Sequence, residues 1–138
     1  MNRLLIDTNI MVYLFNNMLD EDVETMMRDY NTQVYVSSVS VMEFEHLLQN
    51  NRIRSKNFKD INVVSLIEDT FGFRILYTNR EHLLQLQTLP IVEGHNDPND
   101  RLIISQAICE RLELVSSDSL FKHYRRYGLN FISAKKHN

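Results

Sequence analysis

The sequence predicts a three-layer α/β/α domain, in which helices cover both faces of a central parallel sheet of four to five strands. Short, uniformly apolar runs alternate along the chain with longer segments whose apolar residues recur at three and four residue intervals. Such alternation is typical of parallel strands joined by right-handed helical crossovers. The 138 residues, 43% of them apolar, suit one core, so we expect residues 1–138 to form a single domain.

The first half of the chain is expected to hold two strands and three helices. Residues 4–6 form an apolar run that Asp7, Thr8 and Asn9 end as a turn, and residues 34–37 form the next run. Helical spacing is expected over 10–15, 20–30 and 41–48. The polar segment 50–59 is interpreted as a connection.

The second half repeats this alternation. Helical spacing is expected over 59–70, 81–89 and 100–111, with a short helix over 120–124. Strands are expected at 73–77, 114–117 and 130–132. Asp97 and Pro98 form a helix-entry signal, because an aspartate accepts the first free amides while proline has none to leave unpaired.

Four acidic residues are expected at the carboxyl ends of the strands, where ligands bind in such sheets: Asp7, Glu43, Asp100 and Asp118. Carboxylates about 4 Å apart repel by on the order of 4 kcal/mol at an effective dielectric of 20, and either protonation or a bound cation would relieve this repulsion. Oxygen ligands without histidine or cysteine favour Mg²⁺ or Mn²⁺ over zinc. Such ions orient a water for in-line attack on a phosphodiester, which makes phosphodiester hydrolysis the first hypothesis.

Two of the acidic residues have strong structural alternatives. Glu43 follows Ser40 by three residues, the spacing of a capping box in which the glutamate binds the serine amide. Asp97 is better explained as the helix N-cap before Pro98 than as a metal ligand, although it can contact water near the site.

The other acidic residues also admit a structural interpretation. Asp7 and Asp118 could each start an Asx-turn after a strand, and Asp100 could complement a helix dipole. His46 and His95 are assigned no role, because lone histidines are more often solvated or packed.

Four stretches together resemble the PIN domain family, in its VapC-like toxin branch: LIDTN at 5–9, SSVSVMEF at 37–44, DPNDRLIISQA at 97–107 and VSSDSLF at 115–121. The resemblance implies a Mg²⁺- or Mn²⁺-dependent ribonuclease whose acidic quartet maps onto Asp7, Glu43, Asp100 and Asp118. It also implies supporting roles for Asn9, which would orient its turn, and for Ser116. Asn99 departs from the aromatic residue that is common in this branch.

The same resemblance implies a biological setting. It points to an endoribonuclease toxin of a bacterial type II toxin-antitoxin system, with an RNA substrate, a cognate antitoxin protein and a homodimer. The alternative is a non-catalytic PIN-like module that binds RNA or protein. A haloacid-dehalogenase-like phosphatase is disfavoured, because Asn9 stands where that class needs a second acid.

Net charge, basic patches and the N-terminal sequence bear on where RNA would bind and where in the cell the protein is expected. A net charge of -3 gives no overall basic character, so RNA contacts must come from local patches. Lys122, His123, Arg125 and Arg126, beside Asp118, are a better candidate than the basic run at 52–59. The apolar N-terminal stretch is too short for a signal peptide or membrane span, and a lone Cys109 fits a reducing cytoplasm.

Overall fold

The computed structural model describes residues 1–50, 52–53 and 61–135. Its strands are β1 (Asn2–Ile6), β2 (Thr32–Ser37), β3 (Arg74–Leu76), β4 (Glu113–Ser116) and β5 (Asn130–Ser133). Its helices are α1 (Thr8–Phe15), α2 (Glu21–Arg28), α3 (Ser38–Gln49), α4 (Val63–Ser65), the π-helical η2 (Leu66–Thr70), α5 (Arg80–Thr88), α6 (Pro98–Glu110) and the 3₁₀ helix η3 (Ser119–Tyr127). Within these residues, no helix combines the length and the apolar character needed to cross a membrane.

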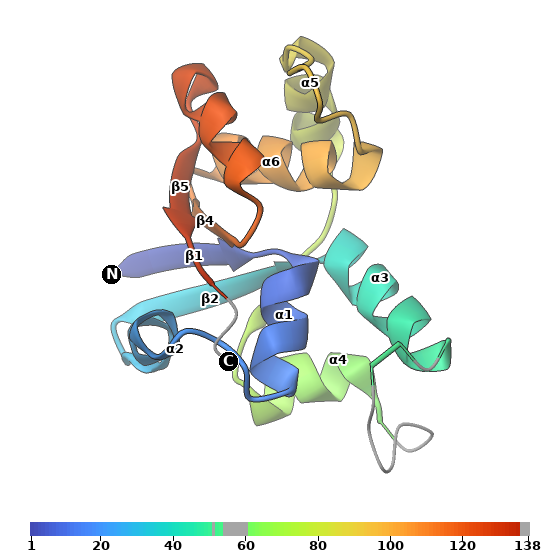
Figure 1. Ribbon diagram of the computed structural model, residues 1–138, viewed down its shortest axis with the longest axis vertical. Coiled ribbons are helices and arrows are strands. Elements are labelled where there is room, and N and C mark those ends of the chain that lie inside the picture. The colour runs from blue at the N-terminus through green and yellow to red at the C-terminus, as the bar shows by residue number, and fades with distance from the viewer. Residues whose placement is uncertain (51, 54–60, 136–138) are drawn as a thin grey trace.

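The five strands form one parallel sheet in the order β3-β2-β1-β4-β5. The first strand lies at the centre, where Leu5 pairs with Tyr35 of β2 on one side and with Leu114 of β4 on the other (Figure 1). The prediction of an α/β fold around a parallel sheet is confirmed, with the higher of the two expected strand numbers. The chain reverses its direction of travel across the sheet after β3, so the carboxyl ends of β1 and β4 adjoin a crevice.

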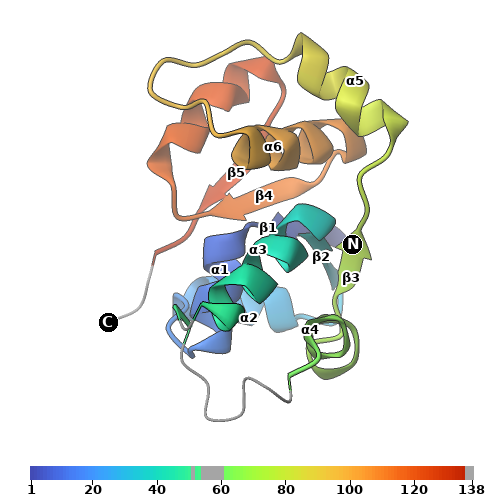
Figure 2. The same ribbon diagram turned by 90° about the vertical axis from the view of Figure 1, so that its right-hand side faces the viewer.

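Successive residues of β1 face opposite sides of the sheet, which explains why its three buried residues, Leu4, Leu5 and Ile6, are all apolar. Leu4 and Ile6 belong to a core shared with α1, α2 and α3, whereas Leu5 belongs to a second core with α6 and η3. The sheet therefore separates two helical layers, with α5 and α6 on one side and α1 to α4 on the other (Figure 2).

Phe44 anchors α3 to the first of these cores. Its side chain is fully buried and meets the ring of Phe15 edge-on, with the centroids 5.3 Å apart. Burying a side chain of this size stabilises the fold by roughly 1.5–3 kcal/mol. Because Glu43 precedes Phe44 on the same helix, this packing also fixes where Glu43 emerges.

The helices that follow β1 and β2 begin earlier than the sequence predicts. Asp7 is the N-cap of α1, so Thr8 and Asn9 lie in the first helical turn. The prediction that they form a separate turn is wrong. Likewise Ser37 caps α3, which begins three residues before the expected start at 41. In both cases the last strand residue or its neighbour caps the helix directly, leaving no loop between them.

Other expected elements are present with altered geometry. The predicted helix over 59–70 is a short α4 followed by the π-helical η2, and the helix after β4 is a 3₁₀ helix. Most of the polar connection at 50–59 lies outside the described residues. Met11 and Met27 are buried in the core of the chain itself.

Candidate active site

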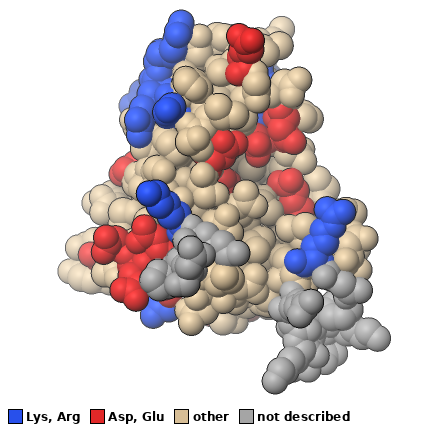
Figure 3. All heavy atoms as spheres, in the orientation of Figure 1, with Lys and Arg blue, Asp and Glu red and all other residues tan. Residues whose placement is uncertain are grey.

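The four predicted acids reach one edge of the sheet from four different elements. Asp7 follows β1, Glu43 lies in α3, Asp100 lies in the first turn of α6 and Asp118 precedes η3. A cavity of about 570 Å³ is lined by Asp7, Glu43 and Asp100, and the charge of Asp118 acts on both aspartates. Figure 3 shows acidic side chains gathered around a hollow between the two halves of the molecule.

Asp7 is the most deeply buried of these acids, with 5% of its surface exposed. Its Oδ1 accepts a hydrogen bond from the amide of Ile10 at 3.0 Å, which caps α1. The pKa of Asp7 is raised from 3.8 to about 6, mainly by burial; the Ser116 hydroxyl and the Ile10 amide lower it, and the charges of Asp100 and Asp118 add smaller increases. The capping role and the place in the site therefore coexist in one side chain.

Glu43 is oriented by a neighbour on α1. The Thr8 hydroxyl donates to Oε1 of Glu43 at 2.7 Å and lies 3.1 Å from the Ser40 hydroxyl. The N-cap of α3 is Ser37, whose Oγ accepts from the amide of Val39 at 3.1 Å. The capping-box interpretation of Ser40 and Glu43 is therefore wrong, and the carboxylate is free to face the cavity.

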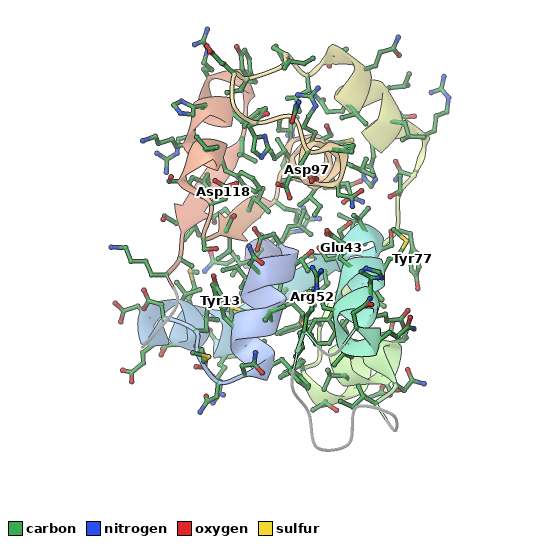
Figure 4. The ribbon with its side chains drawn as sticks, turned by 45° about the vertical axis from the view of Figure 1, so that its right-hand side comes forward. Tyr13, Glu43, Arg52, Tyr77, Asp97 and Asp118 are labelled. Atoms are coloured by element: carbon green, nitrogen blue, oxygen red, sulfur yellow. The ribbon has the colours of Figure 1, made fainter. Side chains whose placement is uncertain are left out.

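Asp97 caps the helix that carries Asp100. Its Oδ1 accepts from the amide of Asp100 at 3.0 Å, and Pro98 occupies the first helical turn, as the helix-entry signal predicts. The Asp97 side chain is exposed, and it is absent from the residues that line the cavity. Figure 4 shows it at the start of α6, above Glu43.

The carboxylate of Asp100 is crowded by negative charge. Its pKa is raised from 3.8 to about 6, mainly by burial and then by the charge of Asp97; His95 lowers it, and Glu43 and Asp118 add smaller increases. Clusters of like charge with raised pKa values are typical of functional sites, because a folded protein otherwise separates such groups.

Asp118 and Asp7 share a buried serine. The backbone amide of Asp118 donates to Oγ of Ser116 at 3.0 Å, and Oδ1 of Asp118 accepts from the amide of Leu120 at 2.9 Å, forming an Asx-turn before η3. The Ser116 hydroxyl also lowers the pKa of Asp7, so this serine contacts the carboxylate of Asp7 and the backbone of Asp118. This placement favours the supporting role expected of Ser116.

His95, for which the sequence predicts no role, lies among these acids. Its Nε2 is 3.4 Å from Oδ2 of Asp100 and 3.9 Å from Oδ2 of Asp118. The ring is buried, and the Tyr124 hydroxyl lies 2.8 Å from Nδ1. The available sequence signal was Gly94, which marks a tight turn just before the entry to α6 and so fixes His95 near the sheet edge.

Arg52 also belongs to this site. Its side chain lines the same cavity, and its backbone amide donates to the carbonyl of Leu47 at 2.9 Å. In Figure 4 the Arg52 side chain rises between α1 and α3 toward Glu43. Arg52 is the one lysine or arginine among the described residues that lines the cavity. Arg54, Lys56 and Lys59 lie outside the described part of the chain.

The basic rim predicted on η3 lies apart from the cavity. Arg125 donates to the carbonyl of Phe131 at 3.1 Å and covers its ring, and Arg126 lies over the ring of Tyr127. Lysine and arginine side chains gather on this edge of the molecule in Figure 3. The sequence pattern favours this rim over the segment that contains Arg52 as the RNA contact. The lining of the cavity does not support that preference, because it includes Arg52 and none of the rim residues.

Two asparagines complete the lining. Asn9 and Asn99 both face the cavity, Asn9 from the first turn of α1 and Asn99 from the first turn of α6. The expectation that Asn9 orients a turn is wrong, because it lies inside the helix. Asn99, which departs from the aromatic residue of the VapC-like branch, places an amide at the cavity wall.

Solved structures with this fold include VapBC2 from Rickettsia felis bound to a DNA fragment from their promoter, with 22% identity, a TM-score of 0.68, and 95% of this chain and 98% of that chain covered. VapBC-1 from nontypeable Haemophilus influenzae aligns with 21% identity, a TM-score of 0.67, and coverage of 95% and 97%. DNA-bound VapBC from Salmonella typhimurium aligns with 16% identity, a TM-score of 0.70, and coverage of 96% and 98%. These similarities establish a shared fold.

Sequence comparison identifies the family. No curated protein matches the chain. The pattern of the PIN domain, however, matches residues 4–127, which takes in all four acids and the cavity between them. The chain belongs to the PIN domain family.

Proposed function

We propose that this protein is a metal-dependent endoribonuclease that hydrolyses RNA phosphodiester bonds. The observation that carries the proposal is the convergence of Asp7, Glu43, Asp100 and Asp118 from four separate elements, with the pKa values of Asp7 and Asp100 both raised to about 6. A bound cation would offset the repulsion among these carboxylates when they are ionised.

The side chains at this site fit a hard divalent cation. Asp7, Glu43, Asp100 and Asp118 supply the carboxylate oxygens that Mg²⁺ and Mn²⁺ prefer, and His95, Asp100 and Asp118 bring three donor atoms within 4.8 Å of one another. When bound, such a cation would lower the pKa of a water molecule and neutralise the charge that develops on the phosphate oxygens.

The chain's own residues would orient these groups and the substrate. Thr8 holds the carboxylate of Glu43, and Ser116 acts on both Asp7 and Asp118. Arg52, at the cavity, offers a guanidinium for a phosphate oxygen of RNA. A cavity of about 570 Å³ admits one unpaired nucleotide, so a single-stranded or looped segment is the expected substrate.

We infer the biological setting from the family and its relatives. The structural similarity to VapBC complexes supports a role as the toxin of a type II toxin-antitoxin pair, with an antitoxin protein as partner. A homodimer remains part of this proposal. Met11 and Met27 are used by the core, so the exposed Met42 and Tyr77 are better candidates for partner contacts.

The test is cleavage of a mixed pool of structured RNAs with Mg²⁺, with Mn²⁺ and with EDTA. We expect cuts that require metal, that are lost in Asp100→Asn and that persist in Asp69→Asn, a matched change on the exposed surface of η2. RNA binding that is independent of metal and unaffected by neutralising the acids, without any cleavage, would favour the non-catalytic binding module.

A further inference from the structure

His95 presents a buried ring nitrogen that has no hydrogen-bond partner among the described residues. Its side chain is 4% exposed, and Nε2 faces Oδ2 of Asp100 at 3.4 Å and Oδ2 of Asp118 at 3.9 Å. Leaving a buried polar atom unpaired typically costs about 1–3 kcal/mol, so the arrangement calls for an explanation.

The ring is held in place from two directions. The backbone amide of His95 donates to the carbonyl of Val92 at 3.0 Å, closing a turn in which Gly94 has a φ of 81°. That conformation favours glycine, because a Cβ atom is strained there. On the other side, the ring meets Phe121 edge-on, with the centroids 5.1 Å apart. His95 is therefore positioned by the fold and does not depend on the acids for its orientation.

The contacts of Tyr124 favour one tautomer of the imidazole. The Tyr124 hydroxyl lies 2.8 Å from Nδ1 of His95 and 3.3 Å from the His95 carbonyl oxygen. With the proton on Nδ1, that nitrogen donates to the tyrosine oxygen, and the hydroxyl hydrogen donates to the carbonyl. Both contacts are then satisfied, and the lone pair of Nε2 points at the two carboxylates.

The distances suit shared coordination better than direct hydrogen bonding. A charge-assisted N–H to carboxylate bond is typically about 2.7–2.9 Å long, well below the 3.4 Å seen here. Nε2 of His95 and one carboxylate oxygen each from Asp100 and Asp118 lie within 4.8 Å of one another, which is close enough for all three atoms to contact one cation.

We propose that His95 is a nitrogen ligand in this site, and that Nε2 of His95, Oδ2 of Asp100 and Oδ2 of Asp118 together bind a divalent transition-metal ion of the Mn²⁺ type in preference to Mg²⁺. The proposal rests on the proposed metal-dependent function, to which it adds one ligand and a metal preference. Tyr124 has the outer role typical of a group that holds the second nitrogen of a ligating histidine.

The expected metal preference follows from the donor set. Carboxylate oxygens serve Mg²⁺ and Mn²⁺ alike, whereas an imidazole nitrogen favours transition metals over the harder Mg²⁺. Loss of His95 should therefore weaken Mn²⁺ binding more than Mg²⁺ binding. If carboxylates are the only protein ligands, removing His95 should change the affinities for Mn²⁺ and Mg²⁺ by the same factor.

The test uses the full chain loaded with MnCl₂. Pulsed electron paramagnetic resonance detects nitrogen directly bonded to Mn²⁺, and calorimetry gives the affinities for Mn²⁺ and Mg²⁺. We expect a nitrogen coupling in the unmodified protein that is lost in His95→Gln and retained in His123→Gln, a matched change of an exposed histidine on η3. His95→Gln should weaken Mn²⁺ binding at least about tenfold.

A second variant guards against a folding defect in His95→Gln. Tyr124→Phe keeps the buried ring and removes the hydroxyl that contacts Nδ1, and we expect it to weaken Mn²⁺ binding more than Mg²⁺ binding. Mn²⁺ bound without any nitrogen coupling would overturn the His95 assignment and leave the carboxylate site standing. No Mn²⁺ or Mg²⁺ binding by the unmodified protein would overturn both this inference and the proposed function.

Discussion

Neutralising Asp7 should stabilise the metal-free protein while it abolishes metal binding. In the folded chain the pKa of Asp7 rises from 3.8 to about 6, because the carboxylate is 95% buried and lies near Asp100 and Asp118. The folded state therefore binds more protons than the unfolded state between these two values, and its stability falls as the pH rises through that window. Asp7→Asn removes this charge but keeps an oxygen that can accept from the Ile10 amide.

The magnitude follows from the same pKa values. At pH 7.5 the ionised Asp7 lowers the free energy of unfolding by up to about 3 kcal/mol, whereas at pH 4 the loss is about 0.6 kcal/mol. A buried amide has its own desolvation cost, so we expect Asp7→Asn to gain roughly 1–3 kcal/mol at pH 7.5 in EDTA. For a chain of this length that corresponds to a rise of about 4–12 °C in Tm.

The assay is thermal unfolding of both proteins at pH 7.5 and pH 4 in EDTA, and at pH 7.5 with MnCl₂. The gain in Asp7→Asn should shrink at pH 4, and Mn²⁺ should raise the Tm of the unmodified protein alone. Asp20→Asn is the matched control, because that aspartate also caps a helix, α2. A variant that is less stable than the unmodified protein in EDTA, by the same amount at both pH values, would refute this reasoning.

Three further substitutions separate substrate contact, helix capping and core packing. Arg52→Ala should weaken RNA binding and reduce its dependence on salt by about one phosphate contact, measured by fluorescence anisotropy over a salt series; an unchanged salt slope would contradict this. Asp97→Ala should cost about 1 kcal/mol in urea unfolding, whereas Asp97→Asn should cost little, and equal losses would argue against a cap. Phe44→Ala should cost about 3–5 kcal/mol, and a loss below about 1 kcal/mol would show that its site collapses.

The sheet could be predicted because the buried part of its central strand, β1, is apolar on both faces. Leu4, Leu5 and Ile6 are all fully buried, and only a strand between two helical layers needs such a run. Helix starts were harder to predict. Asp7 and Ser37 cap their helices directly after the strands. The recurrence of apolar residues every three or four positions identifies the buried face of a helix but not the residue at which the helix begins.

The acids of the site could be predicted because the ends of parallel strands meet at one edge of the sheet. His95 could not, because its environment is assembled by tertiary contacts. The partner of its Nδ1, Tyr124, lies 29 residues further along the chain, and no local periodicity reports that contact. The basic run that includes Arg52 was ranked below the rim on η3 for the same reason, since the place of Arg52 at the cavity depends on how the end of α3 turns back.

If the acids at the cavity catalyse hydrolysis of RNA, water attacks the phosphodiester, and the chemistry of the cut ends reports this step. We would incubate the protein with RNA and Mn²⁺ in ¹⁸O-labelled water, beside Asp100→Asn and an EDTA control. We expect each cut to place one ¹⁸O atom in the new terminal phosphate of one fragment and to leave a free hydroxyl on the other, with no cuts in either control. Products ending in a 2′,3′-cyclic phosphate, or cuts that persist in Asp100→Asn, would contradict it.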